Sequence, residues 1–224
     1  MSGIKPVIRE MREAALHGIT DLRGRLHMLF HNLDDHFDGI VRRVTGEDHI
    51  DVNAPGGSDR LVPRPETLGP DGNIDWSPAP HNGFTLDADG NPIRYDHVPA
   101  AGDRFDRYGP PDGRFVSPIP EDGPFSYESR SLPYYENQAA YHQYEWTRSP
   151  ADVQAAYDDL SPARREIVDE ALSTYGMTLD DLKKVARGEA AAIPEWNTPG
   201  GATQDLLPTS VDVFGTLGMI REVH

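Results

Sequence analysis

Glycine and proline divide most of this chain into short segments, which limits the folds that it can adopt. The sequence contains 21 glycines and 20 prolines among 224 residues, and both residue types disfavour the interior of a helix. After residue 45 many apolar residues come in short alternating runs between these turn-forming residues, a pattern typical of short β-strands. We therefore expect an α+β fold with a β-rich body.

The charge and the absence of cysteine exclude several classes of function. A formal net charge of −16 at pH 7 repels nucleic-acid backbones and anionic lipids, and no lysine-rich block offsets it. The chain has no cysteine, which excludes disulfides, thiolate metal sites and a cysteine nucleophile. Residues 1–10 lack the apolar run of a signal peptide or a membrane span. If the protein is secreted, we expect a route that is independent of a signal peptide.

The first 73 residues differ in pattern from the rest. Residues 1–45 carry an apolar side chain at every third or fourth position, from Ile8 to Val44, which predicts a long amphipathic helix or a helical hairpin. This segment either packs on the protein's own body or docks to a secretion partner or a second copy. Residues 46–73 are rich in proline, glycine and aspartate without apolar periodicity, which predicts a linker. Residues 74–224 form the expected catalytic domain.

Turn and cap signals place the elements of this domain. The runs GFTL and IRYDHV flank a turn at residues 89–90, which predicts a β-hairpin. Further strands are expected at residues 114–116, 141–146 and 219–223. Residues 149–189 are interpreted as a small helical insertion, in which Ser161 starts a helix that ends at Gly176 and Thr178 starts a second that ends at Gly188.

Four arginines stand close together against the acidic background. Arg104, Arg107, Arg114 and Arg130 lie within 27 residues. The planar fork of arginine binds two phosphate oxygens at once, so loops that bring two such forks together would hold a pyrophosphate. The alternative is surface ion pairing with neighbouring carboxylates. Charge alone does not decide between them.

A series of short motifs favours phosphate binding over surface ion pairing for these arginines. From residue 76 to residue 224 the sequence resembles the tuberculosis necrotizing toxin family of NAD-glycohydrolases. The resemblance rests on WSPAPHNGF at 76–84, DRYG at 106–109, GRFVSP at 113–118, RSLP at 130–133, YHQY at 141–144, PGGATQ at 199–204, LPTSV at 207–211 and GMIREV at 218–223. Each motif is weak alone, and their common order over one domain makes the signal strong.

The resemblance implies a role for individual residues. Arg107 and Gln204 match residues that the family uses in catalysis, and the family's arginines face the phosphates and the nicotinamide-side ribose. Gly200 matches a glycine that lets its loop approach the substrate closely. The implied substrate-binding residues are Arg130, Phe115, Gly200, His142 and Tyr108.

Two departures from the family pattern qualify these roles. At Phe115 the family often carries tyrosine, so a step that depends on a phenolic hydroxyl is in doubt and the ring remains for stacking. The stretch between the histidine and the glutamine motifs is longer than the family leads us to expect, which matches the predicted insertion.

The resemblance implies a toxin that hydrolyses NAD+, or NADP+, to nicotinamide and ADP-ribose. It would act in the cytosol of a target cell, and a cognate immunity protein is expected. NAD is the substrate, so no cofactor is expected, and without an HExxH motif or paired histidines no metal site is expected either. The alternatives are an ADP-ribosyltransferase and an inactive NAD-binding interaction module.

The sequence does not identify the residue that stabilises the ribose cation or activates water in this reaction. Nicotinamide departs as a neutral pyridine, so its departure needs no general acid. A carboxylate would stabilise the positive charge that develops on the ribose or activate water. The glutamates nearest to the motifs are Glu128, Glu145 and Glu195, and none of them belongs to a motif.

Overall fold

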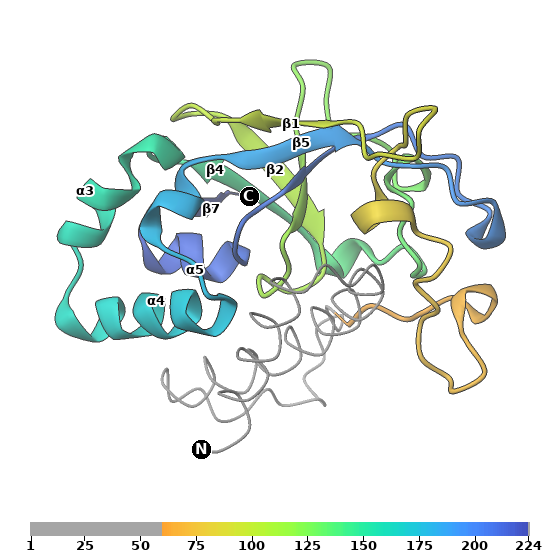
Figure 1. The fold of residues 1–224 in the computed structure, drawn as a ribbon, viewed down its shortest axis with the longest axis horizontal. Coiled ribbons are helices and arrows are strands. Elements are labelled where there is room, and N and C mark those ends of the chain that lie inside the picture. Colours follow the sequence, from red (N-terminus) through yellow and green to blue (C-terminus); the bar gives the residue numbers. More distant parts are fainter. Residues whose placement is uncertain (1–59, 224) are drawn as a thin grey trace. The chain divides into compact units, whose positions relative to one another are not determined.

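The computed structural model describes residues 60–223, and the predicted N-terminal helix lies outside the described residues. The described part is built on one seven-stranded antiparallel sheet with the strand order β1-β5-β6-β3-β2-β4-β7 (Figure 1). The strands are β1 (Arg94–His97), β2 (Arg104–Tyr108), β3 (Phe115–Pro118), β4 (Tyr141–Trp146), β5 (Val185–Glu189), β6 (Thr203–Leu206) and β7 (Ile220–Val223). A β-rich antiparallel fold with few helices agrees with the sequence analysis.

Within residues 60–223, three α-helices accompany the sheet, and they gather at one end of it in Figure 1. They are α3 (Val153–Asp158), α4 (Pro162–Tyr175) and α5 (Val211–Thr216). The side chain of Ser161 caps α4, and Gly176 ends it in the left-handed conformation (φ 64°), as the sequence predicts. The ring of Phe214 on α5 packs on that of Trp146 on β4, with centroids 5.1 Å apart. This contact anchors α5 to the sheet.

Seven short 3₁₀ helices connect these elements within residues 60–223. They are η1 (Pro65–Thr67), η2 (Pro80–Gly83), η3 (Glu128–Arg130), η4 (Gln138–Ala140), η5 (Pro150–Asp152), η6 (Leu179–Lys183) and η7 (Pro194–Trp196).

The strand β3 joins two halves of the sheet through very few residues. It pairs with β6 through Phe115 and Val116 only, and with β2 through Ser117 and Pro118 only. One half consists of β1, β5 and β6, and the other of β2, β4 and β7. Because β3 ends early, the two halves are not bridged by a strand beyond Pro118. The candidate site lies at that point.

The predicted second helix is wrong. Thr178 does cap a helical segment, but this is η6, which ends at Lys183, and the chain then enters β5 in the middle of one half-sheet. The reason is burial: Val185 pairs with His97 and is 1% exposed, and pairing with β1 and β6 satisfies the backbone of this segment. The helical segment therefore ends before residue 185.

The predicted hairpin is confirmed at its turn and at the start of the flanking runs, where the backbone N–H of Ile93 donates to the Thr85 oxygen (2.8 Å). Asp87 and Gly90 form a turn, and Leu86 bridges to Pro92. Beyond that bridge, β1 pairs with β5. Strands occur at all three other predicted places, as β3, β4 and β7.

Part of the predicted linker packs on the domain. The backbone N–H of Arg64 donates to the Pro133 oxygen (2.9 Å), and that of Tyr135 donates to the Val62 oxygen (2.9 Å). Thr67 is fully buried, and its hydroxyl lies 3.1 Å from the Pro133 oxygen. The domain in the structure therefore includes residues before position 74.

Candidate active site

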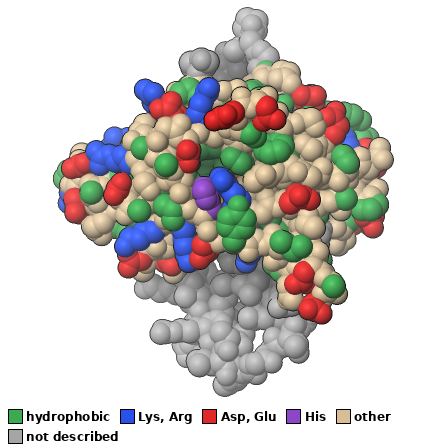
Figure 2. Space-filling model, turned by 90° about the horizontal axis from the view of Figure 1, so that it is seen from above, with side chains coloured by type: hydrophobic (Ala, Val, Ile, Leu, Met, Phe, Trp, Pro, Cys, Tyr) green, Lys and Arg blue, Asp and Glu red, His purple; other side chains and the backbone are tan. Residues whose placement is uncertain are grey.

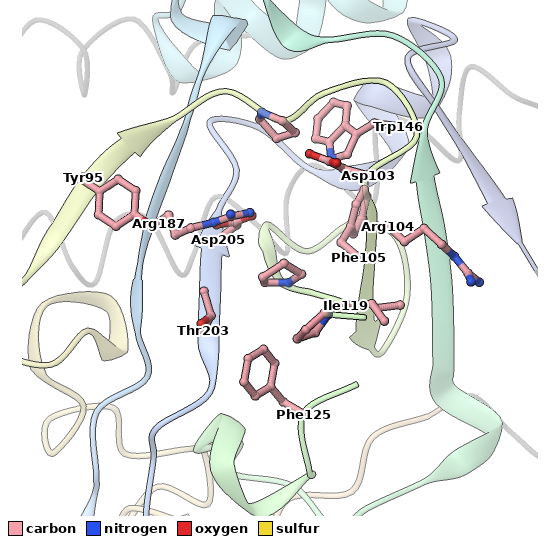
Figure 3. A pocket seen from close by; sticks show the side chains of 13 residues that line it. Tyr95, Asp103, Arg104, Phe105, Ile119, Phe125, Trp146, Arg187, Thr203 and Asp205 are labelled. Carbon is pink, nitrogen blue, oxygen red and sulfur yellow. The ribbon is translucent and has the colours of Figure 1, made fainter. Parts of the chain in front are cut away.

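A cleft of about 380 Å³ lies where β3 ends, between the two halves of the sheet (Figure 3). Arg187, Thr203 and Asp205 come from the half that contains β5 and β6, and Phe105 and Trp146 come from the other half. The volume lies within the usual range for small-molecule sites. Figure 2 looks onto the side of the molecule where β1 and β5 lie in Figure 1, and it shows a hollow near the centre with basic and histidine side chains beside it.

An ion pair between Arg187 and Asp205 stands in this cleft. Nε of Arg187 donates to Oδ1 of Asp205 and Nη2 donates to Oδ2, both at 2.7 Å. The side chain of Asp205 is 4% exposed and that of Arg187 is 19% exposed. Burial opposes the charge of Arg187, but the hydrogen bonds and the charge of Asp205 outweigh it, so the pKa of Arg187 is raised. The guanidinium stays charged and faces the cleft.

His97 lies near this ion pair. Its Nε2 atom is buried and has no hydrogen-bond partner within residues 60–223. Burial lowers the pKa of His97, and the positive charge of Arg187 lowers it further, against the opposing charges of Asp205 and Asp103. The imidazole is therefore held towards its neutral form.

The register of the sheet decides which predicted site residues share a face. Residues opposite each other in an antiparallel ladder point to the same face, and successive residues alternate. Phe105 is opposite Pro118, and Val116 is opposite Asp205. These residues, together with Arg107, define the face that we call the cleft face. Gln204 lies between Thr203 and Asp205 in β6 and therefore points to the opposite face.

Arg107 lies on the cleft face but outside the cleft. Its Nε donates to the Gly109 oxygen (3.2 Å), and Nη1 is buried with no hydrogen-bond partner within residues 60–223. A Cβ at Gly113 would overlap both terminal nitrogens. Burial lowers the pKa of Arg107, and the nearby charge of Asp112 opposes that change. In this structure the guanidinium packs against the loop at residues 109–113.

Arg130 is part of a network on the opposite face. It forms a two-contact ion pair with Asp106, with side-chain exposures of 6% and 0%, and it also donates to the Phe125 oxygen (3.0 Å). The hydroxyl of Tyr141 donates to Oδ2 of Asp106 (2.8 Å). The ring of Tyr108 lies 5.4 Å from the guanidinium carbon of Arg130. Arg130 and Tyr108 are thus brought together.

Gln204 and Phe115 lie on this same opposite face. Phe115 is opposite Leu206, two residues from Gln204, and is 41% exposed. Nε2 of Gln204 donates to the Gly83 oxygen (3.0 Å), which orients the amide so that its oxygen points away from Gly83. These two residues are presented together, with an exposed ring and an oriented amide.

The group that lies close to Gly200 in the structure is another backbone segment of the same chain. Gly200 has φ 69°, and a Cβ there would lie 2.5 Å from the Ala190 oxygen and 2.6 Å from the Ala192 nitrogen. No real side chain tolerates such contacts with backbone atoms. The segment that packs against Gly200 is the backbone of residues 190–192.

His142 lies on the cleft face, next to Arg107. The two residues are opposite each other in the ladder of β2 and β4. Nδ1 of His142 lies 2.7 Å from Oε1 of Glu222 on β7, and Nε2 is buried without a hydrogen-bond partner within residues 60–223. The histidine connects β4 to β7.

The predicted site residues therefore fall into two groups. Phe115, Gln204, Tyr108 and Arg130 occupy one face of the sheet, and Arg107 and His142 the other. None of these lines the cleft. The expectation that Arg107 and Gln204 border one ribose stays a prediction of the family resemblance.

A second cavity of about 510 Å³ lies beside β1 and β5. Lys184, Arg94 and Leu206 line it, and Nζ of Lys184 pairs with Asp96 at 2.5 Å. Within residues 60–223, no cluster of three or more histidine, aspartate or glutamate side chains could hold a metal ion. No helix in this part of the chain is long and apolar enough to cross a membrane.

Residues 100–158 match the family model described as Tuberculosis necrotizing toxin. This segment of the chain is therefore similar to the tuberculosis necrotizing toxin family. A search of curated proteins finds no match. Among solved structures, the chain is similar to "Atomic structure of tuberculosis necrotizing toxin (TNT) complexed with its immunity factor IFT", at 17% identity and a TM-score of 0.40, over 70% of this chain and 66% of that chain. The match thus spans slightly under two thirds of that protein's length.

The segment that matches the tuberculosis necrotizing toxin family supplies one wall of the cleft. Phe105, Phe125 and Trp146 come from it. Arg187 and Asp205 come from β5 and β6, outside the matched segment. Neither residue is among the site residues that the sequence predicts. The signal available was the alternation TQDL at residues 203–206, which places Thr203 and Asp205 on one face of a strand.

Proposed function

We propose that this protein is an NAD+ glycohydrolase that hydrolyses NAD+ to nicotinamide and ADP-ribose, with NADP+ as the alternative substrate. The observation that carries the proposal is the match of residues 100–158 to the toxin family. This segment also builds one wall of a cleft of ligand size. Delivery into the cytosol of a target cell and a cognate immunity protein belong to the same proposal, and both rest on the family resemblance.

The reaction breaks the bond between the ribose C1′ and the nicotinamide nitrogen. The electron pair of that bond goes to the nitrogen, so nicotinamide leaves as a neutral molecule. The oxygen of water forms the new bond to C1′, and the proton passes to solvent. Positive charge develops on the ribose before water attacks, so oriented dipoles and charges lower the barrier.

Gln204 is the proposed catalytic residue whose local geometry best suits such a role. Its amide is oriented by the hydrogen bond to the Gly83 oxygen, so its own oxygen is held in place before a substrate binds. Phe115 on the same face offers an exposed ring for stacking. Arg107, the second catalytic residue that the resemblance implies, would act from the other face, and its packing against residues 109–113 supports a role in the shape of that loop.

A product analysis tests the proposal. The purified full chain is incubated with NAD+, and nicotinamide, free ADP-ribose and protein-attached ADP-ribose are quantified with and without added acceptor proteins. Equal amounts of nicotinamide and free ADP-ribose are expected. Nicotinamide released with ADP-ribose attached to protein would identify a transferase. A folded chain that releases no nicotinamide from NAD+ or NADP+ would overturn the proposal.

A further inference from the structure

Asp205 occupies only one edge of the Arg187 guanidinium. A guanidinium carries five N–H groups, and Asp205 accepts those of Nε and one of Nη2. Within residues 60–223 no other hydrogen bond is made by this side chain. The N–H groups of Nη1 and the second one of Nη2 are left for a ligand. Figure 3 shows the guanidinium beside Asp205, directed into the space between the two walls.

The other arginines around the sheet do not offer such an edge to the cleft. Arg130 gives its N–H groups to Asp106 and to the Phe125 oxygen. Arg104 lines the cleft, but its guanidinium turns away from it in Figure 3 and donates to Oε1 of Gln143 (2.7 Å). Among the arginines that line the cleft, Arg187 is therefore the one directed into it.

The wall opposite Arg187 is apolar. Phe105, Ile119 and Phe125 line the cleft, and the sticks of Figure 3 show Phe105 and Ile119 across from Arg187 and Phe125 at one end of the space. On the near side stands the ring of Tyr95, which is 61% exposed. An occupant that satisfies both walls has an anionic group with two adjacent oxygens and a flat apolar ring. A nucleotide has both.

We propose that Arg187 binds a phosphate group of a nucleotide in this cleft, with Asp205 as the positioning residue that holds the guanidinium in place. This inference rests on the proposed function for the identity of the nucleotide. Either of two groups of the dinucleotides has the required chemistry. One is the pyrophosphate, which NAD+ and NADP+ share, and the other is the 2′-phosphate of NADP+. Nicotinamide release with each dinucleotide distinguishes them.

One carboxylate in the cleft works against an anion. Asp103 lines the cleft and influences both Arg187 and His97 through its charge. Oδ2 of Asp103 accepts from the Ala100 N–H (2.8 Å), a bond that the amide oxygen of asparagine can also accept. Asp103→Asn removes one negative charge and is therefore expected to strengthen phosphate binding severalfold. If a variant acted only by disturbing the packing of the cleft, it would weaken phosphate binding and not strengthen it.

The test measures ADP binding to the full chain by titration calorimetry. ADP is expected to bind the wild type, and Arg187→Gln is expected to weaken binding roughly tenfold or more, as for the loss of a charged two-contact hydrogen bond. Arg187→Lys keeps the positive charge but loses the two-contact geometry of the guanidinium, so its ADP affinity is expected to lie between those of the wild type and Arg187→Gln. Arg148→Gln removes an exposed arginine that does not line the cleft; it is the matched control and is expected to bind ADP within about twofold of the wild type.

Arg187→Gln leaves the buried Asp205 without its partner and is therefore at risk of unfolding. The double variant Arg187→Gln with Asp205→Asn removes that unpaired charge and provides a second folded protein without the guanidinium. ADP binding by a folded single or double variant with wild-type affinity would overturn the inference. So would a folded wild type that binds neither ADP nor adenosine 2′,5′-bisphosphate, which carries the 2′-phosphate of NADP+.

The same variants separate this inference from the proposed function. ADP binding that depends on Arg187 in a chain that releases no nicotinamide would sustain the inference and reject the glycohydrolase. Nicotinamide release from NAD+ and NADP+ that is unchanged in the folded double variant would sustain the glycohydrolase and reject the inference. A loss confined to NADP+ would assign the 2′-phosphate to Arg187, and an equal loss with both dinucleotides would assign the pyrophosphate.

Discussion

Arg130 and Asp106 form a two-contact ion pair inside the domain, with side-chain exposures of 6% and 0%. The pair links the loop at residues 125–130 to the middle of β2, and Tyr141 adds a hydrogen bond to the same carboxylate. The DRYG and RSLP motifs of the sequence therefore meet through Asp106 and Arg130. Both residues contribute to the fold whatever else they bind.

Arg130→Met is expected to lower the free energy of unfolding by about 3–5 kcal/mol, because the carboxylate of Asp106 is left buried without its partner. Urea unfolding followed by fluorescence measures the change. Arg148→Met is the matched control, since its partner Asp159 is exposed and the expected loss is below about 1 kcal/mol. A stable Arg130→Met protein with weakened NAD+ binding would instead assign Arg130 to the substrate.

Gly200→Ala is expected to destabilise the protein much more than Gly201→Ala. Both glycines have a positive φ, which costs an alanine about 1 kcal/mol. Only at Gly200 would the new Cβ overlap backbone atoms, those of residues 190–192, whereas at Gly201 no atom lies within 4 Å. The expected total for Gly200→Ala is about 3 kcal/mol or more. Equal losses in thermal or urea unfolding would show that the two backbone segments are not in contact.

The start of the domain is tested by two fragments. A fragment of residues 60–224 keeps the bonds of Val62, Arg64 and Thr67 to residues 133–135, and a fragment of residues 74–224 loses them. The shorter fragment is expected to be less stable by about 2 kcal/mol or more, at roughly 1 kcal/mol for each net hydrogen bond. Identical urea midpoints and slopes would place the boundary at residue 74, as the sequence composition predicts.

Much of the fold could be predicted from local signals, and the cleft could not. Ser161 and Gly176 are local cap residues, and they bound α4 as predicted. The strand β5 was assigned to a helix, because the run KKVARGE follows the cap at Thr178 and its strand pairing depends on residues 94–97 and 203–206. Arg187 pairs with Asp205 across that non-local ladder. A sequence does not report such a register directly.

The same holds for the candidate site residues: the sequence indicates their motifs, but it does not show which side chains meet. Asp106 and Arg130 both lie in motifs that the sequence analysis singled out, and their pairing across 24 positions emerges only in the fold. Arg107 and Gln204 were expected around one ribose, and the ladder through Val116 and Asp205 points them to opposite faces. The order of the motifs indicates the family, whereas the face of the sheet to which each side chain points depends on strand register.

The stability of the protein is expected to fall as the pH drops below about 6.5. Burial and the charge of Arg187 lower the pKa of His97 from its ordinary value of 6.5 in the folded protein, although Asp205 and Asp103 oppose this. The unfolded chain therefore binds the proton more readily, and protonation favours unfolding. His97→Gln should lose less stability than the wild type between pH 7.5 and pH 5.5 in urea unfolding. Exposed His81→Gln is the control, and an equal slope in all three proteins would contradict this role.

The most direct measurement is the rate of nicotinamide release from NAD+ by the purified full chain and by Gln204→Ala. The wild type is expected to release nicotinamide and ADP-ribose in equal amounts. Gln204→Ala is expected to unfold like the wild type and to be slower by roughly a hundredfold, the usual effect of losing one oriented polar contact to the transition state. Gln154→Ala, on the exposed surface of α3, is expected to match the wild-type rate. A folded wild type that leaves NAD+ and NADP+ intact would contradict the account.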